Sequence, residues 1–158
     1  MSLVGIIGAM EEEVSQLKEQ MTDVQIKKKA AMEFCRGNLN GKPVVVVRSG
    51  IGKVNAGICA QILVDDYQVD YMINTGIAGS LKNEINIGDI VVSTDTVQHD
   101  MDATGFGYPL GQIPRMDTLS FPADEKLVAL AQEVCREVIP EIQVFAGRVV
   151  SGDQFVSD

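Results

Sequence analysis

The sequence contains few of the residues from which metal and redox sites are built. It has a single histidine, His99, and three widely spaced cysteines, Cys35, Cys59 and Cys135, with no CxxC pair. Zinc sites need cysteine and histidine ligands at short, regular spacings. We therefore expect no metal site, and we expect the cysteines to be free thiols in the core, where unpaired cysteines are commonly found.

Basic residues and long apolar runs are also scarce. The chain carries 13 Lys and Arg against 22 Asp and Glu, a net charge of −9, whereas a nucleic-acid partner requires a positive surface. The longest apolar runs are too short to span a bilayer, and the chain does not open with a basic segment followed by an apolar one, as secretory signals do. We expect a cytoplasmic protein without a nucleic-acid or membrane partner.

Several common catalytic and nucleotide-binding motifs are missing. The turn SGIGK includes Gly52 and Lys53, but Val47 and Val54 stand where a P-loop needs a glycine and a hydroxyl residue. The same turn lacks the third glycine of a dinucleotide-binding fingerprint. There is no GxSxG elbow and no HExxH. The common hydrolase and dinucleotide-binding classes are therefore disfavoured.

What the sequence does contain is an alternation of strands and helices. Its 158 residues, 46% of them hydrophobic, suffice for one domain with a sizeable core. Periodicity and turn residues predict buried strands at 3–8 and 69–74, two exposed strands within 24–39, further strands at 42–49, 88–98 and 142–151, and helices at 11–21, 54–67 and 123–138, with 99–122 irregular. Asn40-Gly41 predicts a hairpin turn. The order predicts an α/β fold: a mixed, largely parallel central sheet flanked by helices, in a single domain covering 1–158.

Four of the predicted strands end in small turns that contain glycine. These turns are Gly8-Ala9, Ser49–Gly52, Asn74–Gly79 and Ser151–Asp153. Ligands of open α/β sheets bind outside the carboxyl ends of the strands, and glycine lets the backbone approach a ligand closely. Four such ends could build one pocket, although tight strand-to-helix turns also need glycine for their own geometry.

Three consecutive acids, Glu11, Glu12 and Glu13, open the first predicted helix. At about 100° per residue, the apolar stripe of that helix centres about 70° from Glu13, about 90° from Glu11 and about 170° from Glu12. We therefore expect Glu13 at the edge of the buried face and Glu12 in water. A partly buried carboxylate at a helix start can orient and deprotonate a water, although all three acids could simply complement the helix dipole. Clustered carboxylates also repel a phosphate from this helix start, which favours water as co-reactant.

Six segments of the chain match one enzyme family in order: GIIGAMEEEV, SGIGKVNAG, INTGIAGSL, GDIVVS, HDMDATGFGYPLGQIP and VVSGDQFV. The chain resembles the 5'-methylthioadenosine/S-adenosylhomocysteine nucleosidases, a family of the purine nucleoside phosphorylase superfamily, over almost its whole length. The resemblance implies a homodimeric hydrolase without a cofactor. Such an enzyme cleaves the N-glycosidic bond of methylthioadenosine, S-adenosylhomocysteine and 5'-deoxyadenosine through an oxocarbenium-like sugar and releases adenine.

The resemblance also implies roles for individual residues. Glu13 would hold and activate the water, and the substrate would be lined by Ala9, Met10 and Ile51 beside the sugar and by Ile77, Ala78 and Gly79 beneath the nucleoside. Adenine would meet Phe155 and the backbone of Val156, and the 5'-alkylthio pocket of a neighbouring subunit would be closed by Ala103, Phe106 and Pro114. The family often has a small residue where this chain has Ile77. Phe155 as core and Phe106 as loop packing are the structural alternatives.

Three other functions stay open. The family's ribose-binding Met-Glu pair and its adenine-protonating Asp match no residue of this sequence. We therefore expect the chain to be the N-terminal two-thirds of such an enzyme, truncated at Asp158, and an inactive nucleoside-binding fragment is one alternative. A futalosine hydrolase is another. A phosphate-dependent purine nucleoside phosphorylase is the third, but Asn74 and Ile77 stand where those enzymes place phosphate-binding Arg and Ser.

Overall fold

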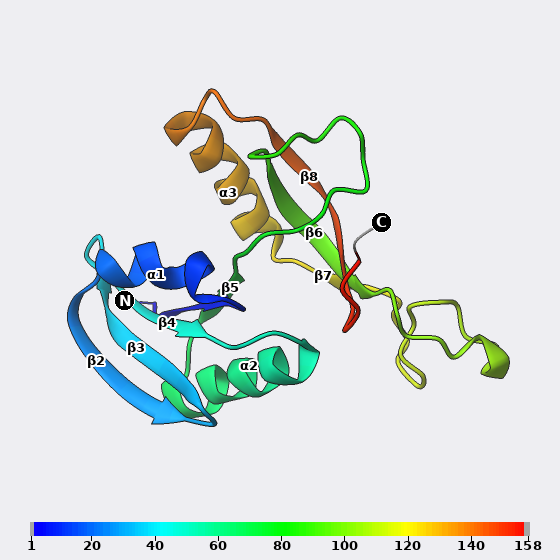
Figure 1. The fold of residues 1–158 in the computed structure, drawn as a ribbon, viewed down its shortest axis with the longest axis horizontal. Coiled ribbons are helices and arrows are strands. Elements are labelled where there is room, and N and C mark those ends of the chain that lie inside the picture. The colour runs from blue at the N-terminus through cyan, green and yellow to red at the C-terminus, as the bar shows by residue number, and fades with distance from the viewer. Residues whose placement is uncertain (1, 157–158) are drawn as a thin grey trace. The chain divides into compact units, whose positions relative to one another are not determined.

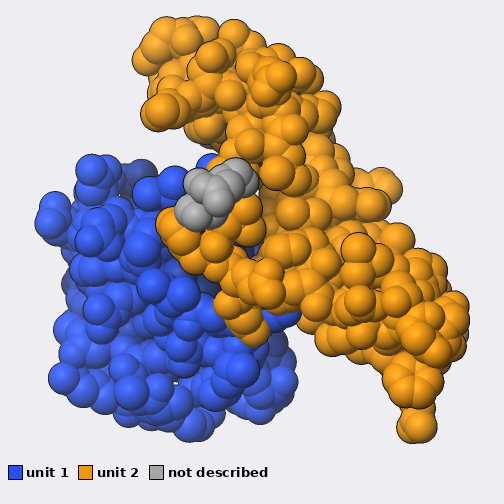
Figure 2. Space-filling view, turned by 45° about the vertical axis from the view of Figure 1, so that its right-hand side comes forward, with its two compact units in different colours: residues 1–78 blue, residues 79–158 orange. Residues whose placement is uncertain are grey.

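The chain is described by a computed structural model over residues 2–156. It divides into two compact units, residues 1–78 and residues 79–158, which Figure 2 colours separately. Each unit has its own sheet and at least one helix (Figure 1), so the predicted α/β class with mixed strand pairing is confirmed. A single domain from residue 1 to residue 158 stays a prediction. Between residues 2 and 156, none of the helices is both long enough and apolar enough to cross a membrane.

The first unit is built on a five-stranded sheet in the order β2-β3-β4-β1-β5. Its strands are β1 (Val4–Gly8), β2 (Thr22–Lys29), β3 (Met32–Leu39), β4 (Lys42–Arg48) and β5 (Tyr71–Asn74). β1 pairs in parallel with both β4 and β5, while β2, β3 and β4 form an antiparallel meander. The carboxyl ends of β1, β4 and β5 therefore lie at the same edge of the sheet.

Helices α1 (Glu11–Glu19) and α2 (Lys53–Tyr67) cover opposite faces of this sheet. The four consecutive valines of β4 explain why both faces are needed. Val45 and Val47 belong to the core under α2, with Leu63, and Val44 and Val46 belong to the core under α1, with Val14. A strand that is buried on both faces reads as a continuous apolar run, because alternate side chains point to opposite faces.

Two strands differ in burial from the sequence prediction. β3 was expected to be exposed, but Phe34 is fully buried and Met32 and Cys35 are buried, because β3 pairs on both edges and faces the core. β5 was expected to be buried, but Tyr71, Met72 and Ile73 are between 43% and 45% exposed. The reason is its position: β5 is the edge strand of the sheet, beside β1.

The second unit has a three-stranded sheet in the order β7-β6-β8. β6 (Ile90–Gln98) pairs in parallel with β8 (Val144–Ser151) and antiparallel with the short β7 (Phe121–Pro122). Helix α3 (Glu125–Val138) packs on β6 and β8. Asp124 caps its start, because its carboxylate accepts the backbone N–H groups of Lys126 and Leu127 at 3.0 Å each. The segment predicted to be irregular contains β7 and the one-turn helix η1 (Thr104–Phe106), neither of which has a periodic signal.

The cysteines confirm the expectation of free thiols, but only two of the three are buried. Cys35 and Cys59 lie in the core of the first unit, and burial raises the pKa of the Cys59 thiol to about 11. Cys135 is only half-buried, because α3 covers one side of a small sheet and keeps part of its own surface exposed.

Two hairpins of the first unit use the same tight turn with different residues. Both turns join paired strands through two residues of positive φ, 48° and 74° at Asn40-Gly41 and 49° and 61° at Ala30-Ala31. Asn-Gly is the preferred sequence for such a turn, and it was predicted. Ala-Ala gives no turn signal, and the left-handed conformation costs an ordinary residue about 1–2 kcal/mol. The hydrogen bonds between β2 and β3 on either side of the turn offset this strain.

The turns give a matched pair of stability predictions. Replacing Ala30-Ala31 by Asn-Gly should raise the free energy of unfolding by about 1 kcal/mol, because both new residues tolerate positive φ. Replacing Asn40-Gly41 by Ala-Ala should lower it by a similar amount. Urea unfolding followed by circular dichroism measures both changes. A loss of stability in the first variant would contradict the strained turn at Ala30-Ala31.

Candidate active site

The predicted glycine-bearing strand ends of the first unit come together in the structure. Past the last pairs of the ladder, the N–H of Ser49 donates to the carbonyl of Gly8 at 2.9 Å. The N–H of Thr75 donates to the carbonyl of Ile7, also at 2.9 Å. The turns after β1, β4 and β5 therefore start side by side. The fourth predicted turn, Ser151–Asp153, belongs to the second unit.

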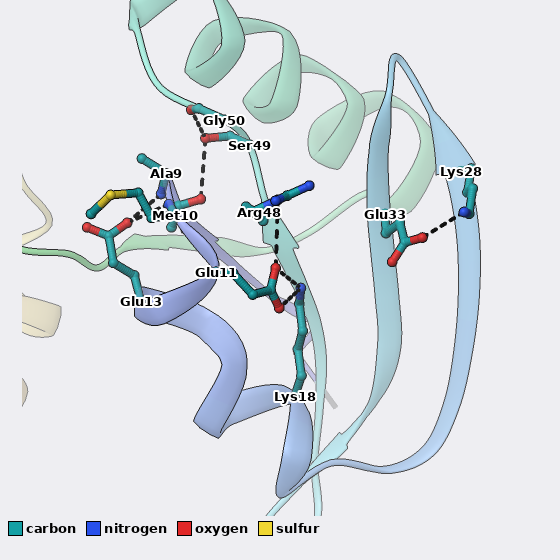
Figure 3. Close-up of polar contacts among 11 residues, drawn as sticks. Ala9, Met10, Glu11, Glu13, Lys18, Lys28, Glu33, Arg48, Ser49 and Gly50 are labelled. Atoms are coloured by element: carbon teal, nitrogen blue, oxygen red, sulfur yellow. Dashed lines mark hydrogen bonds and ion pairs between the residues drawn. The ribbon is translucent and has the colours of Figure 1, made fainter.

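The Glu13 carboxylate ties two of these turns together. Its Oε2 accepts the backbone N–H groups of Ala9 at 2.7 Å and Met10 at 2.9 Å, and its Oε1 accepts the N–H of Ile77 at 3.0 Å. Figure 3 shows the side chain reaching back from α1 toward Ala9 and Met10. Met10 is the residue before the helix, so Glu13 occupies the third helical position, from which a glutamate commonly bonds to the N–H before the helix.

The three glutamates separate as the helical phase predicts. Glu13 is half-buried, whereas Glu11 and Glu12 are exposed. Glu11 lies on another side of α1 (Figure 3). Its carboxylate accepts a hydrogen bond from the Lys18 ammonium at 2.8 Å and lies 3.7 Å from the Arg48 guanidinium. Glu13 is thus the acid of the run that faces the strand ends.

The hydrogen bonds of Glu13 limit what else its carboxylate can bind. An ionised carboxylate has about four acceptor positions, and three are taken by backbone N–H groups, two on Oε2 and one on Oε1. Charge-assisted bonds of this kind hold the group in one orientation. The remaining position, on Oε1, is available to one donor such as a water molecule.

Two glycines make room for this carboxylate. A Cβ at Gly76 would lie 2.9 Å from Cδ of Glu13 and closer still to Oε1. A Cβ at Gly8 would lie 3.0 Å from Cβ of Glu13 and 2.6 Å from Cγ1 of Val14. Sequence reasoning attributed these glycines to turns and to ligand approach. The steric role of Gly76 was missed, because it depends on a side chain more than sixty residues away in the chain.

A wide depression of about 580 Å³ opens beside the same strand ends. It is lined by Ala9, Met10, Glu11, Glu12, Ala31, Arg48, Ser49, Gly50, Ile51 and Asn55. Three predicted substrate residues, Ala9, Met10 and Ile51, therefore share one surface. Glu13 does not line it directly but contacts its wall, since it accepts the N–H groups of Ala9 and Met10. Asn55 was missed by sequence reasoning: its Nδ2 donates to the carbonyl of Ile51 at 2.7 Å and so holds the turn after β4.

The other predicted site residues are mostly exposed. Ile77 is 81% exposed at the end of the first unit, and Phe155 and Phe106 in the second unit are 95% and 87% exposed. The structural alternatives of core packing for Phe155 and loop packing for Phe106 are therefore wrong. Gly79, Pro114 and Val156 are exposed and Ala103 is buried. Within residues 2–156, no cluster of three or more His, Cys, Asp or Glu side chains is arranged to hold a metal ion.

The fit of Gly76 against Glu13 predicts the effect of a single methyl group. Gly76→Ala should displace the carboxylate from the Ile77 N–H and lower the free energy of unfolding by about 1–3 kcal/mol, the usual cost of an added methyl group in a space that is already filled. Gly79→Ala, where no atom lies within 4 Å of the added Cβ, is the control and should change it little. Thermal or urea unfolding measures both. Equal stability of the two variants would contradict the contact.

Comparison with known proteins gives a consistent family assignment. The family model described as the phosphorylase superfamily matches residues 3–158. The methylthioadenosine/S-adenosylhomocysteine nucleosidase of Staphylococcus carnosus is 46% identical over 99% of this chain and 67% of its own. That of Bacillus pumilus is also 46% identical, over 98% of this chain and 66% of its own.

Solved structures agree with these relatives. The nucleosidase of Colwellia psychrerythraea, crystallised with adenine, superposes with a TM-score of 0.94 at 43% identity and covers 99% of this chain and 64% of its own. The Neisseria meningitidis enzyme, crystallised with methylthio-immucillin-A, gives a TM-score of 0.94 at 38% identity, over 99% of this chain and 67% of its own. The chain thus spans about two thirds of the length of these relatives. It belongs to the phosphorylase superfamily and, within it, to the family of 5'-methylthioadenosine/S-adenosylhomocysteine nucleosidases.

Proposed function

We propose that this protein hydrolyses the N-glycosidic bond of 5'-methylthioadenosine and S-adenosylhomocysteine, and also of 5'-deoxyadenosine, releasing adenine. The observation that carries the proposal is the Glu13 carboxylate, fixed by three backbone N–H groups with one acceptor position open. Relatives with the nucleosidase name support the substrate class, as do related structures that hold adenine and methylthio-immucillin-A.

The reaction needs a water on one face of the sugar and a protonated base leaving from the other. As the bond between the sugar and adenine breaks, the anomeric carbon gains oxocarbenium character and takes the oxygen of the water. Glu13 accepts the hydrogen of that water through the open position on Oε1 and then takes its proton as general base. Adenine carries away the electron pair of the broken bond and takes up a proton from a general acid. Because backbone groups orient Glu13, it need not reorganise during the step.

The other predicted site residues, several of them apolar and exposed, are suited to the rest of the substrate. Ala9, Met10 and Ile51 would contact the sugar side, and the turn at Ile77, Ala78 and Gly79 would lie beneath the nucleoside. Phe155 would stack on adenine while the Val156 backbone bonds its edge, and a second subunit would supply Ala103, Phe106 and Pro114. Large exposed apolar side chains commonly mark surfaces that a ligand or partner covers. We infer a cytoplasmic homodimer that acts in methionine salvage without a cofactor.

Phosphorolysis is the second candidate, and one observation favours it. Arg48 lines the depression at the strand ends, where a phosphate could approach it. Glu11 lies 3.7 Å from the Arg48 guanidinium, however, and Glu12 lines the same depression. Two carboxylates beside one arginine leave no net positive charge for a phosphate dianion. Water is therefore the better co-substrate.

The two candidates differ in their need for phosphate. We expect release of adenine from methylthioadenosine in phosphate-free buffer, at a rate that added phosphate leaves unchanged, with the free sugar as the second product. An absorbance assay coupled to adenine oxidation, with mass spectrometry of the sugar, measures both. A phosphate requirement and a sugar 1-phosphate would establish phosphorolysis instead. Adenine binding without release would establish the nucleoside-binding alternative.

Substitutions in the acidic run test the role of Glu13. Glu13→Gln should lower kcat by about 10²–10⁴, the usual contribution of a general base, and leave the Kd for adenine within a few-fold. The amide must turn its NH2 group toward one of the three backbone donors, so a loss of about 1–3 kcal/mol of stability should accompany it.

Glu12→Gln is the matched control for this change, because it alters an exposed acid of the same helix turn. It should leave kcat and the free energy of unfolding nearly unchanged. Equal losses of kcat in both variants, at matched fractions of folded protein, would remove Glu13 from the mechanism. Steady-state kinetics together with urea unfolding separates loss of chemistry from loss of fold.

A further inference from the structure

The carboxyl ends of β6 and β8 carry a second carboxylate that binds backbone. These strands are parallel neighbours, and their ladder ends with Gln98 opposite Ser151. One residue further, the N–H of His99 donates to the carbonyl of Ser151 at 3.0 Å and continues the pairing. Beyond this bond the two segments diverge: β6 leads into the loop that begins at Asp100, and β8 leads into the segment 152–156.

Asp100 holds that segment at its start. Its Oδ2 accepts the backbone N–H of Asp153 at 2.7 Å, a short distance typical of a charge-assisted bond. The bond joins residues 53 positions apart in sequence. It therefore fixes where the chain goes after β8, which the ladder alone does not.

Gly152 is packed against the same group. A Cβ there would lie 2.5 Å from Nε2 of His99 and 2.9 Å from both Cγ and Oδ2 of Asp100. Its φ lies outside the left-handed region, so the glycine is required by space. The Gly152-Asp153 backbone thus rests on the imidazole of His99 and the carboxylate of Asp100.

The residues that follow have little packing of their own. Phe155 and Val156 are 95% and 65% exposed, so their positions are set by the backbone before them. We propose that Asp100, with His99 packed beside it, is a positioning residue that holds the Gly152-Asp153 turn and thereby presents Phe155 and Val156 to the adenine ring. The inference rests on the proposed function, in which these two residues meet adenine.

Asp100→Ala tests the inference with one readout that needs no substrate. Amide hydrogen exchange at Asp153, whose N–H makes the bond, should become about tenfold faster, as expected for the loss of one charge-assisted bond. The KM for methylthioadenosine and the Kd for adenine should rise about tenfold while kcat changes much less, because the chemical groups are untouched. Asp100→Asn keeps an acceptor oxygen and should retain most of the wild-type exchange protection and KM.

The matched control is Asp124→Ala, which removes another carboxylate that accepts backbone N–H groups in the same unit, at the start of α3. It should lower stability without a specific change at Asp153 or in KM. Gly152→Ala is the second test variant, because its added Cβ would collide with the side chains of His99 and Asp100 and displace the turn without removing either side chain. Gly147→Ala, with no atom within 4 Å of the added Cβ, controls for it.

The outcomes distinguish this inference from the proposed function. Unchanged exchange at Asp153 in both Asp100→Ala and Gly152→Ala would overturn the inference, whatever the substrate is. An unchanged KM with faster exchange would also overturn it, because the segment would then not position adenine. A wild-type protein that neither binds nor releases adenine would instead overturn the proposed function.

Discussion

The hydrogen bonds of Glu13 are the interaction on which the site depends. Parallel strands that end at one edge of a sheet expose backbone N–H groups that no strand can satisfy, and the helix after β1 adds more of them. Glu13 accepts three of these groups, two before α1 and one after β5. The same side chain therefore caps the start of α1 and links the turn after β1 to the turn after β5. One acceptor position of its carboxylate is left to bind a water molecule. Its structural and proposed catalytic roles have one physical origin.

This arrangement requires glycine at the two positions that pack against the Glu13 side chain. The Glu13 carboxylate leaves no space for a Cβ at Gly76. At Gly8, a Cβ would collide with Cγ1 of Val14 and Cβ of Glu13. The second unit repeats the arrangement with Asp100 and Gly152. In both units, a carboxylate from the segment that follows one strand accepts an N–H from the turn after a neighbouring strand, and a glycine lets the two approach.

Much of this could be predicted from the sequence, because the relevant signals are local. Helical phase separated Glu13 from Glu12, and Asn40-Gly41 gave the hairpin. The burial of β3 and the exposure of β5 could not be predicted, because burial depends on strand order, which periodicity does not contain. The turn at Ala30-Ala31 could not be predicted from the sequence, because strand pairing imposes positive φ on two residues that do not prefer it. The contacts of Gly76 and Gly152 were missed because their partners are distant in sequence.

A nuclear magnetic resonance comparison of the wild-type protein with Glu13→Gln tests the central claim most directly. The amide protons of Ala9, Met10 and Ile77 report the three hydrogen bonds to the Glu13 carboxylate. If one carboxylate accepts all three N–H groups, all three amide signals should move upfield together in Glu13→Gln, since a neutral amide is a weaker acceptor and cannot satisfy all three donors. An Ile77 amide that keeps its wild-type position, while Ala9 and Met10 move, would show that Glu13 only caps its own helix and would contradict the account.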